Sequence, residues 1–284
     1  MNVVLISTSD VSQGRSDSLN RLLHAVERVA TRRPDFSIVL LLLLQKCPDE
    51  LFRSVSEPFP SFVESTATGR QISLSAARNT LLIRASSIGL IDDATVVGFP
   101  DDDCWYPEDT LEYIVDAFGH NPQLDLWFCR YASRPHTPAE SGVAPAVARA
   151  RDVIRQASSN TMFLSGAVLK SSGSFDEALG VGTFNGGGED TEFALRAYLR
   201  GRQSVYFPSE IIGHRDNTPH LRRKYYRGAL IAIARHAKRE PWVGVELVRK
   251  LLVGIWLVVS GQLSLASYTE AVRAAVQSNR VAFS

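Results

Sequence analysis

Apolar runs alternate with helix-like patterns through the first half of the chain. Three short apolar runs, each followed by polar residues, predict strands at residues 3–6, 38–44 and 95–99. Apolar residues recur at helical spacing over residues 18–30 and 73–85. A third helix is expected to begin at Pro107, with acidic residues in its first turn, and to end at Gly119.

Strands that alternate with helices predict an α/β fold with a mostly parallel central sheet flanked by helices. The run at 38–44 is apolar at every position, which is typical of a strand buried on both faces. Ligands of such sheets bind beyond the carboxyl ends of the strands. Those ends are residues 7–10, 45–46 and 101–103, and we expect them to line one crevice.

The second half of the chain has weaker strand signals and ends in a helical pattern. Residues 133–150 are rich in Pro, Ala and small polar residues, which predicts a surface loop. Strand signals return near residues 161–164 and 204–207, and the pattern is helical from residue 224 to the end. We therefore expect a helical C-terminal extension to the α/β region.

The composition is that of a globular protein and excludes some partners. Of the 284 residues, 45% are hydrophobic and 21% are charged, which is ordinary for a folded protein. The formal net charge of +1 gives no global field for nucleic acid, so we expect no nucleic-acid partner. The three cysteines form no metal-binding or disulfide pattern, and the first apolar run is too short for an export signal. A cytoplasmic protein with reduced thiols is the simplest interpretation.

Three consecutive carboxylates follow the third predicted strand directly. Asp101, Asp102 and Asp103 repel one another, and a divalent cation would relieve this repulsion by taking oxygen ligands. Such a cation usually binds substrate phosphates as well. A solvated acidic turn is the alternative, but Phe99 and Trp105 flank the triplet and favour a positioned turn.

A second cluster of carboxylates opens a helix that is expected to close at Gly201. Three glycines precede three acidic residues there: Gly186, Gly187, Gly188, Glu189, Asp190 and Glu192. The helix dipole stabilises acidic residues at an N-terminus, which explains one carboxylate well. Glycines let a backbone approach a ligand closely, and a carboxylate that faces this ligand can act as a general base. The segment therefore predicts a site for a hydroxyl nucleophile.

Four short motifs follow one another along the chain. They are residues 73–79 (SLSAARN), 99–103 (FPDDD), 174–182 (SFDEALGVG) and 188–193 (GEDTEF). Their order and separations resemble those of family 2 glycosyltransferases of the GT-A fold. The resemblance covers roughly residues 1–220 and implies an inverting enzyme of the bacterial surface-polysaccharide type.

The same resemblance implies a division of the chain. Residues 1–220 would form a GT-A (Rossmann-like) catalytic domain. Within it, residues 1–105 would bind the nucleotide sugar, and residues 106–220 would supply the acceptor and catalytic part. Residues 221–284 would form the C-terminal helical extension.

The resemblance also implies a role for each matching residue. Asp101 and Asp103 match the DxD motif and would ligate Mn²⁺ or Mg²⁺, with Asp101 and Asp102 near the nucleotide. Asp190 matches the catalytic base of the family, and Glu189 would orient that base or hold the acceptor. The remaining residues expected at the nucleotide sugar are Thr8, Ser9, Arg78, Asn79, Gly187 and Gly188.

The second predicted strand ends differently from its counterparts in that family. Relatives commonly carry an acidic pair that contacts the nucleobase, whereas this chain has Gln45, Lys46 and Cys47. The amide of Gln45 can still bond to a pyrimidine edge. A UDP or dTDP sugar is therefore the favoured donor, with guanosine left open. The acceptor implied by the resemblance is a glycan or a lipid-linked glycan.

The sequence also suggests a role for His214 and a binding surface in the C-terminal helical region. In similar enzymes a histidine after the last strand can reach the metal or the diphosphate, while a capping or surface histidine is the alternative for His214. Residues 243–259 are strongly apolar, but their uninterrupted run of nine residues at 251–259 is too short to span a membrane. This stretch can pack on the catalytic region, on a second subunit of a homodimer, or on the inner face of the cell membrane.

Two other functions draw on similar features. A sugar nucleotidyltransferase also combines an α/β crevice, a metal and acidic residues. It would usually show a glycine-rich basic loop after the first strand, of which Gly14 and Arg15 are a faint echo. A non-catalytic nucleotide-sugar-binding partner in a glycan assembly pathway would not need Asp101, Asp103 and Asp190. These carboxylates favour a glycosyltransferase.

Overall fold

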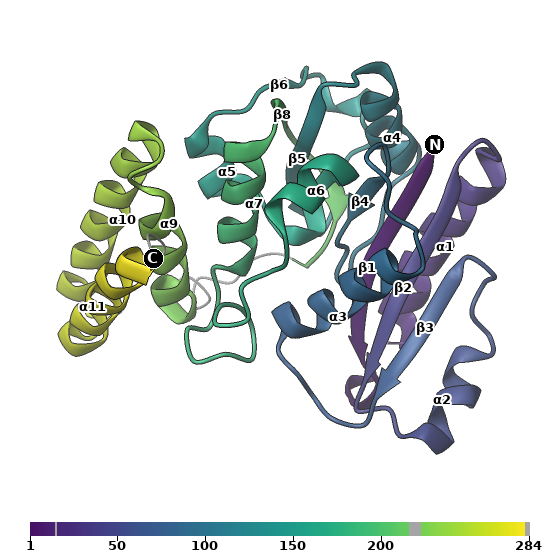
Figure 1. The fold of residues 1–284 in the computed structure, drawn as a ribbon, viewed down its shortest axis with the longest axis horizontal. Coiled ribbons are helices and arrows are strands. Elements are labelled where there is room, and N and C mark those ends of the chain that lie inside the picture. Colours follow the sequence, from purple (N-terminus) through teal and green to yellow (C-terminus); the bar gives the residue numbers. More distant parts are fainter. Residues whose placement is uncertain (15, 216–222, 282–284) are drawn as a thin grey trace.

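Eight strands form one central sheet in the described part of the chain, in the order β3-β2-β1-β4-β7-β5-β8-β6 (Figure 1). The structure is a computed structural model that describes residues 1–14, 16–215 and 223–281. The strands are β1 Asn2–Asp10, β2 Ser37–Gln45, β3 Val63–Thr68, β4 Val96–Gly98, β5 Leu124–Ala132, β6 Ala146–Val147, β7 Met162–Ser165 and β8 Gln203–Gly213.

The sheet is mixed, with most of its length parallel. β3, β2, β1 and β4 are parallel neighbours, and β5 is parallel to β8. β7 is antiparallel to both β4 and β5, and β6 is antiparallel to β8. The predicted α/β fold with a mostly parallel central sheet is therefore confirmed.

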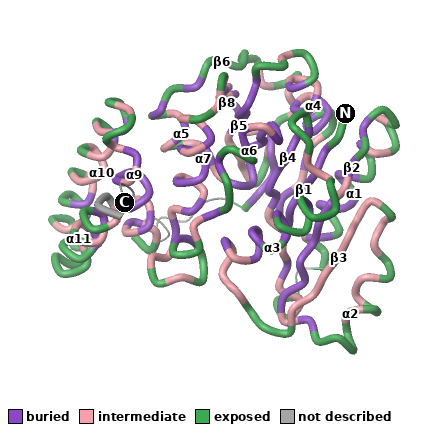
Figure 2. Tube along the Cα trace, in the orientation of Figure 1, coloured by how far each residue is buried: buried purple, intermediate pink, exposed green. Residues whose placement is uncertain are grey.

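Helices cover both faces of the sheet, and three more helices follow at the C-terminal end. The α-helices are α1 Ser16–Arg32, α2 Asp49–Ser56, α3 Leu74–Ser87, α4 Thr110–His120, α5 Ala150–Gln156, α6 Gly166–Ser172, α7 Glu189–Arg200, α9 Tyr226–His236, α10 Pro241–Val259 and α11 Leu265–Val281. Successive side chains of a strand point to opposite faces, so β1 supplies Val3 and Leu5 to one core and Val4 and Ile6 to the other. α1 and α4 line the first core, and α3, α6 and α7 line the second. Figure 2 shows the central strands as largely buried.

The last three helices pack around a third apolar cluster. Tyr226, Leu230, Leu257 and Ala271 form its centre, and α9 packs against both α10 and α11. α9 also packs against α7, which attaches this helical extension to the α/β region. No helix in the described ranges is long and apolar enough to cross a membrane.

Some predicted elements differ from the structure for local reasons. Asp109 has a left-handed φ of 61°, so α4 begins at Thr110 rather than at Pro107, and Gly119 lies inside the helix. The predicted loop at 133–150 contains β6, which adds an edge strand to β8. β3 is half-buried at every position and has no alternation of apolar and polar residues. The sequence therefore did not predict this strand, which pairs with β2.

Close backbone contact between α9 and the glycine segment before α7 yields a stability prediction. A Cβ at Gly228 would overlap the carbonyl of Gly187, and one at Gly188 would overlap the carbonyl of Gly228. We expect Gly228→Ala to lower the free energy of unfolding by about 3 kcal/mol, because backbone at both sides must move. Urea unfolding followed by circular dichroism measures this.

The matched control is Gly119→Ala in α4. A Cβ there would meet the flexible end of Met1 at 3.3 Å. Because Ala favours a helix interior over Gly, this variant should be neutral or more stable by about 0.5–1 kcal/mol. Equal losses in the two variants would contradict the proposed tight contact between α9 and the segment before α7.

Candidate active site

The carboxyl ends of three parallel strands open into a cleft of about 810 Å³. Thr8 near the end of β1, Gln45 at the end of β2 and the Asp101–Asp103 turn after β4 line one side. The N-terminus of α7, with Glu189 and Asp190, lines the other side. The predicted convergence of three strand ends on one crevice is therefore observed, and α7 faces them across it.

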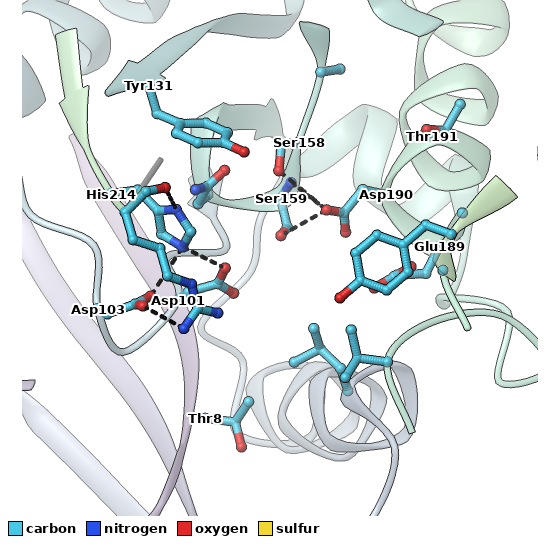
Figure 3. Close-up of a pocket in the computed structure, with 18 of the residues that line it drawn as sticks. Thr8, Asp101, Asp103, Tyr131, Ser158, Ser159, Glu189, Asp190, Thr191 and His214 are labelled. Carbon is cyan, nitrogen blue, oxygen red and sulfur yellow. Dashed lines mark hydrogen bonds and ion pairs between the residues drawn. The ribbon is translucent and has the colours of Figure 1, made fainter. Parts of the chain in front are cut away.

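Asp101, Asp103 and His214 form a compact cluster at the cleft wall (Figure 3). His214 directly follows β8, and its Nε2 lies 3.0 Å from Asp103 Oδ1 and 3.5 Å from Asp101 Oδ2. One ligand atom from each residue lies within 4.8 Å of the others. The sequence suggested His214 for this place, and the structure brings it there.

The chemistry of this cluster fits a divalent cation. Two carboxylates supply the oxygen ligands that Mg²⁺ and Mn²⁺ prefer, and an imidazole nitrogen completes the set. Nδ1 of His214 lies 2.9 Å from the carbonyl oxygen of Arg215, so an Nδ1–H can donate there and leave Nε2 as the ligand. Burial opposes a charge on His214, but its bonds to Asp101 and Asp103 outweigh burial and raise its pKa to about 9. A bound cation must therefore replace this proton.

Asp102 is not part of that cluster and instead ties the turn to β1. Its Oδ2 accepts a 2.7 Å hydrogen bond from the hydroxyl of Ser9, and both side chains are buried. Asp102 still contributes to the cleft lining, whereas Ser9 does not. The structure thus places Ser9 beneath the site, as a support for the acidic turn.

A buried arginine connects the two sides of the cleft. Arg78 is 2% exposed, and its guanidinium lies 3.1 Å from Asp101 Oδ1 and 3.0 Å from Asp190 Oδ1. It also donates to the hydroxyl of Ser159 at 2.6 Å. Burial disfavours the charged guanidinium, but Asp190 and Asp101 outweigh burial and raise the pKa of Arg78. Arg78 therefore stays charged and fixes the spacing between the acidic turn and α7.

The carboxylate of Asp190 is held in one orientation. Its Oδ2 accepts hydrogen bonds from the backbone N–H and the hydroxyl of Ser159, at 3.0 and 3.1 Å, and from the hydroxyl of Ser158 at 3.3 Å (Figure 3). Ser158 and Ser159 precede β7 and were not expected at the site. Nothing local in the sequence marks them, because their partner lies more than thirty residues away.

Glu189 has a different environment from its neighbour. It is 5% exposed, and burial together with the negative charge of Asp190 raises its pKa to about 7. The two adjacent carboxylates thus have different partners: Asp190 is ion-paired to Arg78, whereas Glu189 is partly protonated near neutral pH. Such a pair can separate the roles of base and hydrogen-bond donor.

Gln45 and Asn79 use their amides within the protein. Gln45 donates to Thr8 Oγ1 and accepts from the backbone N–H of Ile72, both at 2.8 Å, and it lines the cleft together with Thr8. Asn79 instead bonds in both directions to the backbone of Phe175 and lies outside the cleft lining. The structure therefore does not bring Asn79 to the cleft, and its amide holds the neighbouring loop.

The glycines before α7 serve packing as well as the cleft. Gly187 and Gly188 both line it, but Gly188 has a left-handed φ of 91° and both glycines make room for the start of α9. Tyr225, just before α9, also lines the cleft and was not predicted. Close approach to a ligand, which the sequence predicts for these glycines, therefore accounts for only part of their role.

The fold of the chain is that of GT-A-like glycosyltransferase structures. No protein-family model and no curated protein matches the chain. Among solved structures, S. aureus TarS 1–349 in complex with UDP-GlcNAc is similar in fold, with 13% sequence identity and a TM-score of 0.60. The match covers 99% of this chain and 90% of the TarS chain. For TarS 1–349 in complex with UDP, the match covers 82% of this chain and 65% of the TarS chain, with 15% identity and a TM-score of 0.59.

A second protein in these comparisons has the same fold. For GalNAc-T7 with UDP, GalNAc and Mn²⁺, the match covers 82% of this chain and 47% of the GalNAc-T7 chain, with 13% identity and a TM-score of 0.57. The chain spans 43% of the longer TarS structure, so it corresponds to part of that protein. At these identities the likeness establishes the fold.

The raised pKa of Glu189 predicts how stability depends on pH. The folded protein keeps a proton on Glu189 up to about pH 7, whereas the unfolded chain loses it near the ordinary glutamate pKa of 4.5. Stability from this residue is therefore present at low pH and is lost as the pH rises through that window. In the wild type we expect Glu189 to lower the free energy of unfolding by about 3 kcal/mol between pH 5 and pH 8. Glu189→Gln, which mimics the protonated form, should abolish this part of the pH dependence.

Urea unfolding at the two pH values, with Glu50→Gln on the exposed face of α2 as the control, measures this difference. The control should follow the wild type. A Glu189→Gln protein whose pH dependence also parallels the wild type would refute the assignment.

Proposed function

We propose that the protein is a metal-dependent inverting glycosyltransferase that moves a sugar from a nucleoside diphosphate sugar to a hydroxyl of a glycan or lipid-linked acceptor. One observation carries the proposal. The three candidate metal ligands, Asp101, Asp103 and His214, face the same cleft as the fixed carboxylate of Asp190. Arg78 forms ion pairs with both Asp101 and Asp190. The proposal includes membership of family 2 and a catalytic domain at residues 1–220.

The cluster side of the cleft suits the donor. Asp101, Asp103 and His214 would hold Mn²⁺ or Mg²⁺, and a cation there supplies charge stabilisation for the departing diphosphate. Thr8 and Gln45 lie on the same side and would contact the nucleoside. The complexes of TarS with UDP and UDP-GlcNAc, and of GalNAc-T7 with UDP and Mn²⁺, support this choice of donor.

The α7 side suits the acceptor. Asp190 would take the proton of an acceptor hydroxyl as its oxygen attacks the anomeric carbon from the face opposite the diphosphate. A single displacement of this kind inverts the anomeric centre. The hydroxyl of Ser158 makes the longest bond to Asp190, so an acceptor hydroxyl could replace it while Arg78 and Ser159 keep the carboxylate in place.

Glu189 would complement the base. With a pKa of about 7, its carboxyl is partly protonated at neutral pH and can donate a hydrogen bond to an oxygen of the acceptor substrate. Its position beside Asp190 on the first turn of α7 places both groups at one end of the cleft.

Removal of one cluster ligand should uncouple donor binding from the metal. For the wild type, UDP-GlcNAc with Mn²⁺ at about 100 times its Kd should raise the Tm by about 5 °C. Asp103→Asn should lose most of the Mn²⁺-dependent part of that shift, because one of two carboxylate ligands becomes neutral. Differential scanning fluorimetry, with the exposed Asp17→Asn as the control, measures it. A full shift in Asp103→Asn would contradict the assigned metal site.

Removal of the proposed base should affect turnover and spare donor binding. Asp190→Asn should lower kcat for transfer about 10³-fold, since general bases contribute on this scale. The Kd for UDP-GlcNAc should change less than about twofold, because Asp190 lies on the acceptor side. UDP release with a panel of glycan acceptors and calorimetric titration give the two values. Turnover at the wild-type rate would eliminate Asp190 as the base.

A further inference from the structure

The outward side of α10 is mostly apolar, and Arg249 at its margin is ion-paired with Glu246. Seven large side chains are exposed there: Trp242, Val245, Val248, Leu252, Ile255, Trp256 and Val259. They fall on one arc of the helix, opposite the buried Val243 and Gly254. We call these seven residues the α10 face. An apolar helix face of this size that is left exposed is typical of an interaction surface, so this face points to a partner.

The helical extension is basic, although the chain as a whole is nearly neutral. Residues 224–284 contain nine Lys and Arg against three Asp and Glu, whereas residues 1–223 contain 22 against 27. The two segments therefore carry +6 and −5, which together give the +1 of the chain. Lys238 and Arg239, both exposed, stand in the turn just before Trp242. The α10 face thus lies within a positively charged region.

The charge distinguishes between two occupants of the α10 face. A symmetric dimer through this face would bring two segments of +6 together, which costs electrostatic free energy. An anionic lipid surface would bind both the apolar side chains and the surrounding cations. Trp242 and Trp256 stand near the two ends of α10, and indole rings favour the boundary between lipid and water.

The opposite side of α10 is tied to the cleft. Glu246 is 4% exposed and accepts two hydrogen bonds from Arg155 of α5, at 2.5 and 3.1 Å. Arg155 also belongs to the cleft lining. A surface that binds the α10 face would therefore lie one helix away from the acceptor end of the cleft.

We propose that the α10 face docks the protein on an anionic lipid surface, with α10 lying along that surface. A lipid-linked acceptor could then reach the cleft without leaving the membrane. This second statement rests on the proposed function, whereas the docking does not.

Vesicle flotation of the full chain tests the docking. The wild type should bind vesicles of about 30% phosphatidylglycerol in phosphatidylcholine and should bind pure phosphatidylcholine about tenfold more weakly. The double variant Leu252→Gln/Trp256→Gln should bind the anionic vesicles at least about tenfold more weakly, because two exposed apolar anchors are removed. The matched control is Ile83→Gln on α3, which changes an apolar residue that is 70% exposed elsewhere and should bind like the wild type.

Two results would overturn the proposal. One is equal binding of the wild type and the double variant to anionic vesicles, or no binding by either. The other is a wild-type dimer in sedimentation velocity that Leu252→Gln/Trp256→Gln converts to a monomer, which would assign the α10 face to a second copy. Thermal melting is the check that both variants are folded. UDP-GlcNAc binding should be unchanged in the double variant, so a failure of docking would leave the proposed function intact.

Discussion

A buried guanidinium between two carboxylates holds the site together. Arg78 pairs with Asp101 on the strand side and with Asp190 on the helix side, although these residues lie 89 positions apart in the chain and on different elements. The guanidinium is 2% exposed, whereas the side chains of Asp101 and Asp190 are 31% and 24% exposed. Removal of these carboxylates would leave a buried positive charge without its ion-pair partners. The distance across the cleft therefore depends on Arg78, and the proposed separation of donor and acceptor depends on that distance.

The acidic turn and α7 are positioned by different forces. Asp101–Asp103 follow a buried strand whose place is fixed by parallel pairing with β1. The first turn of α7 is fixed by glycines that let α9 approach its backbone. The helical extension thus reaches the site through α9, while α10 carries its apolar face on the outside.

Much of this arrangement could be predicted from the sequence, and the rest required tertiary contacts. The strands at 3–6 and 38–44 and the convergence of their ends followed from continuous apolar runs, because such runs report burial on both faces. The contact of His214 with Asp103 followed from resemblance alone. Asn79 was expected at the donor, but its amide is used by Phe175, and Ser159 was missed because hydroxyl partners carry no periodic signal.

The decisive experiment is a crystal structure with UDP-GlcNAc and Mn²⁺, with anomalous scattering recorded at the manganese edge. We expect one anomalous peak bound by Asp101, Asp103 and His214, with the diphosphate beside it and the anomeric carbon turned toward Asp190. A manganese peak elsewhere, or a diphosphate that contacts α7 while the Asp101–Asp103 turn stays empty, would contradict it.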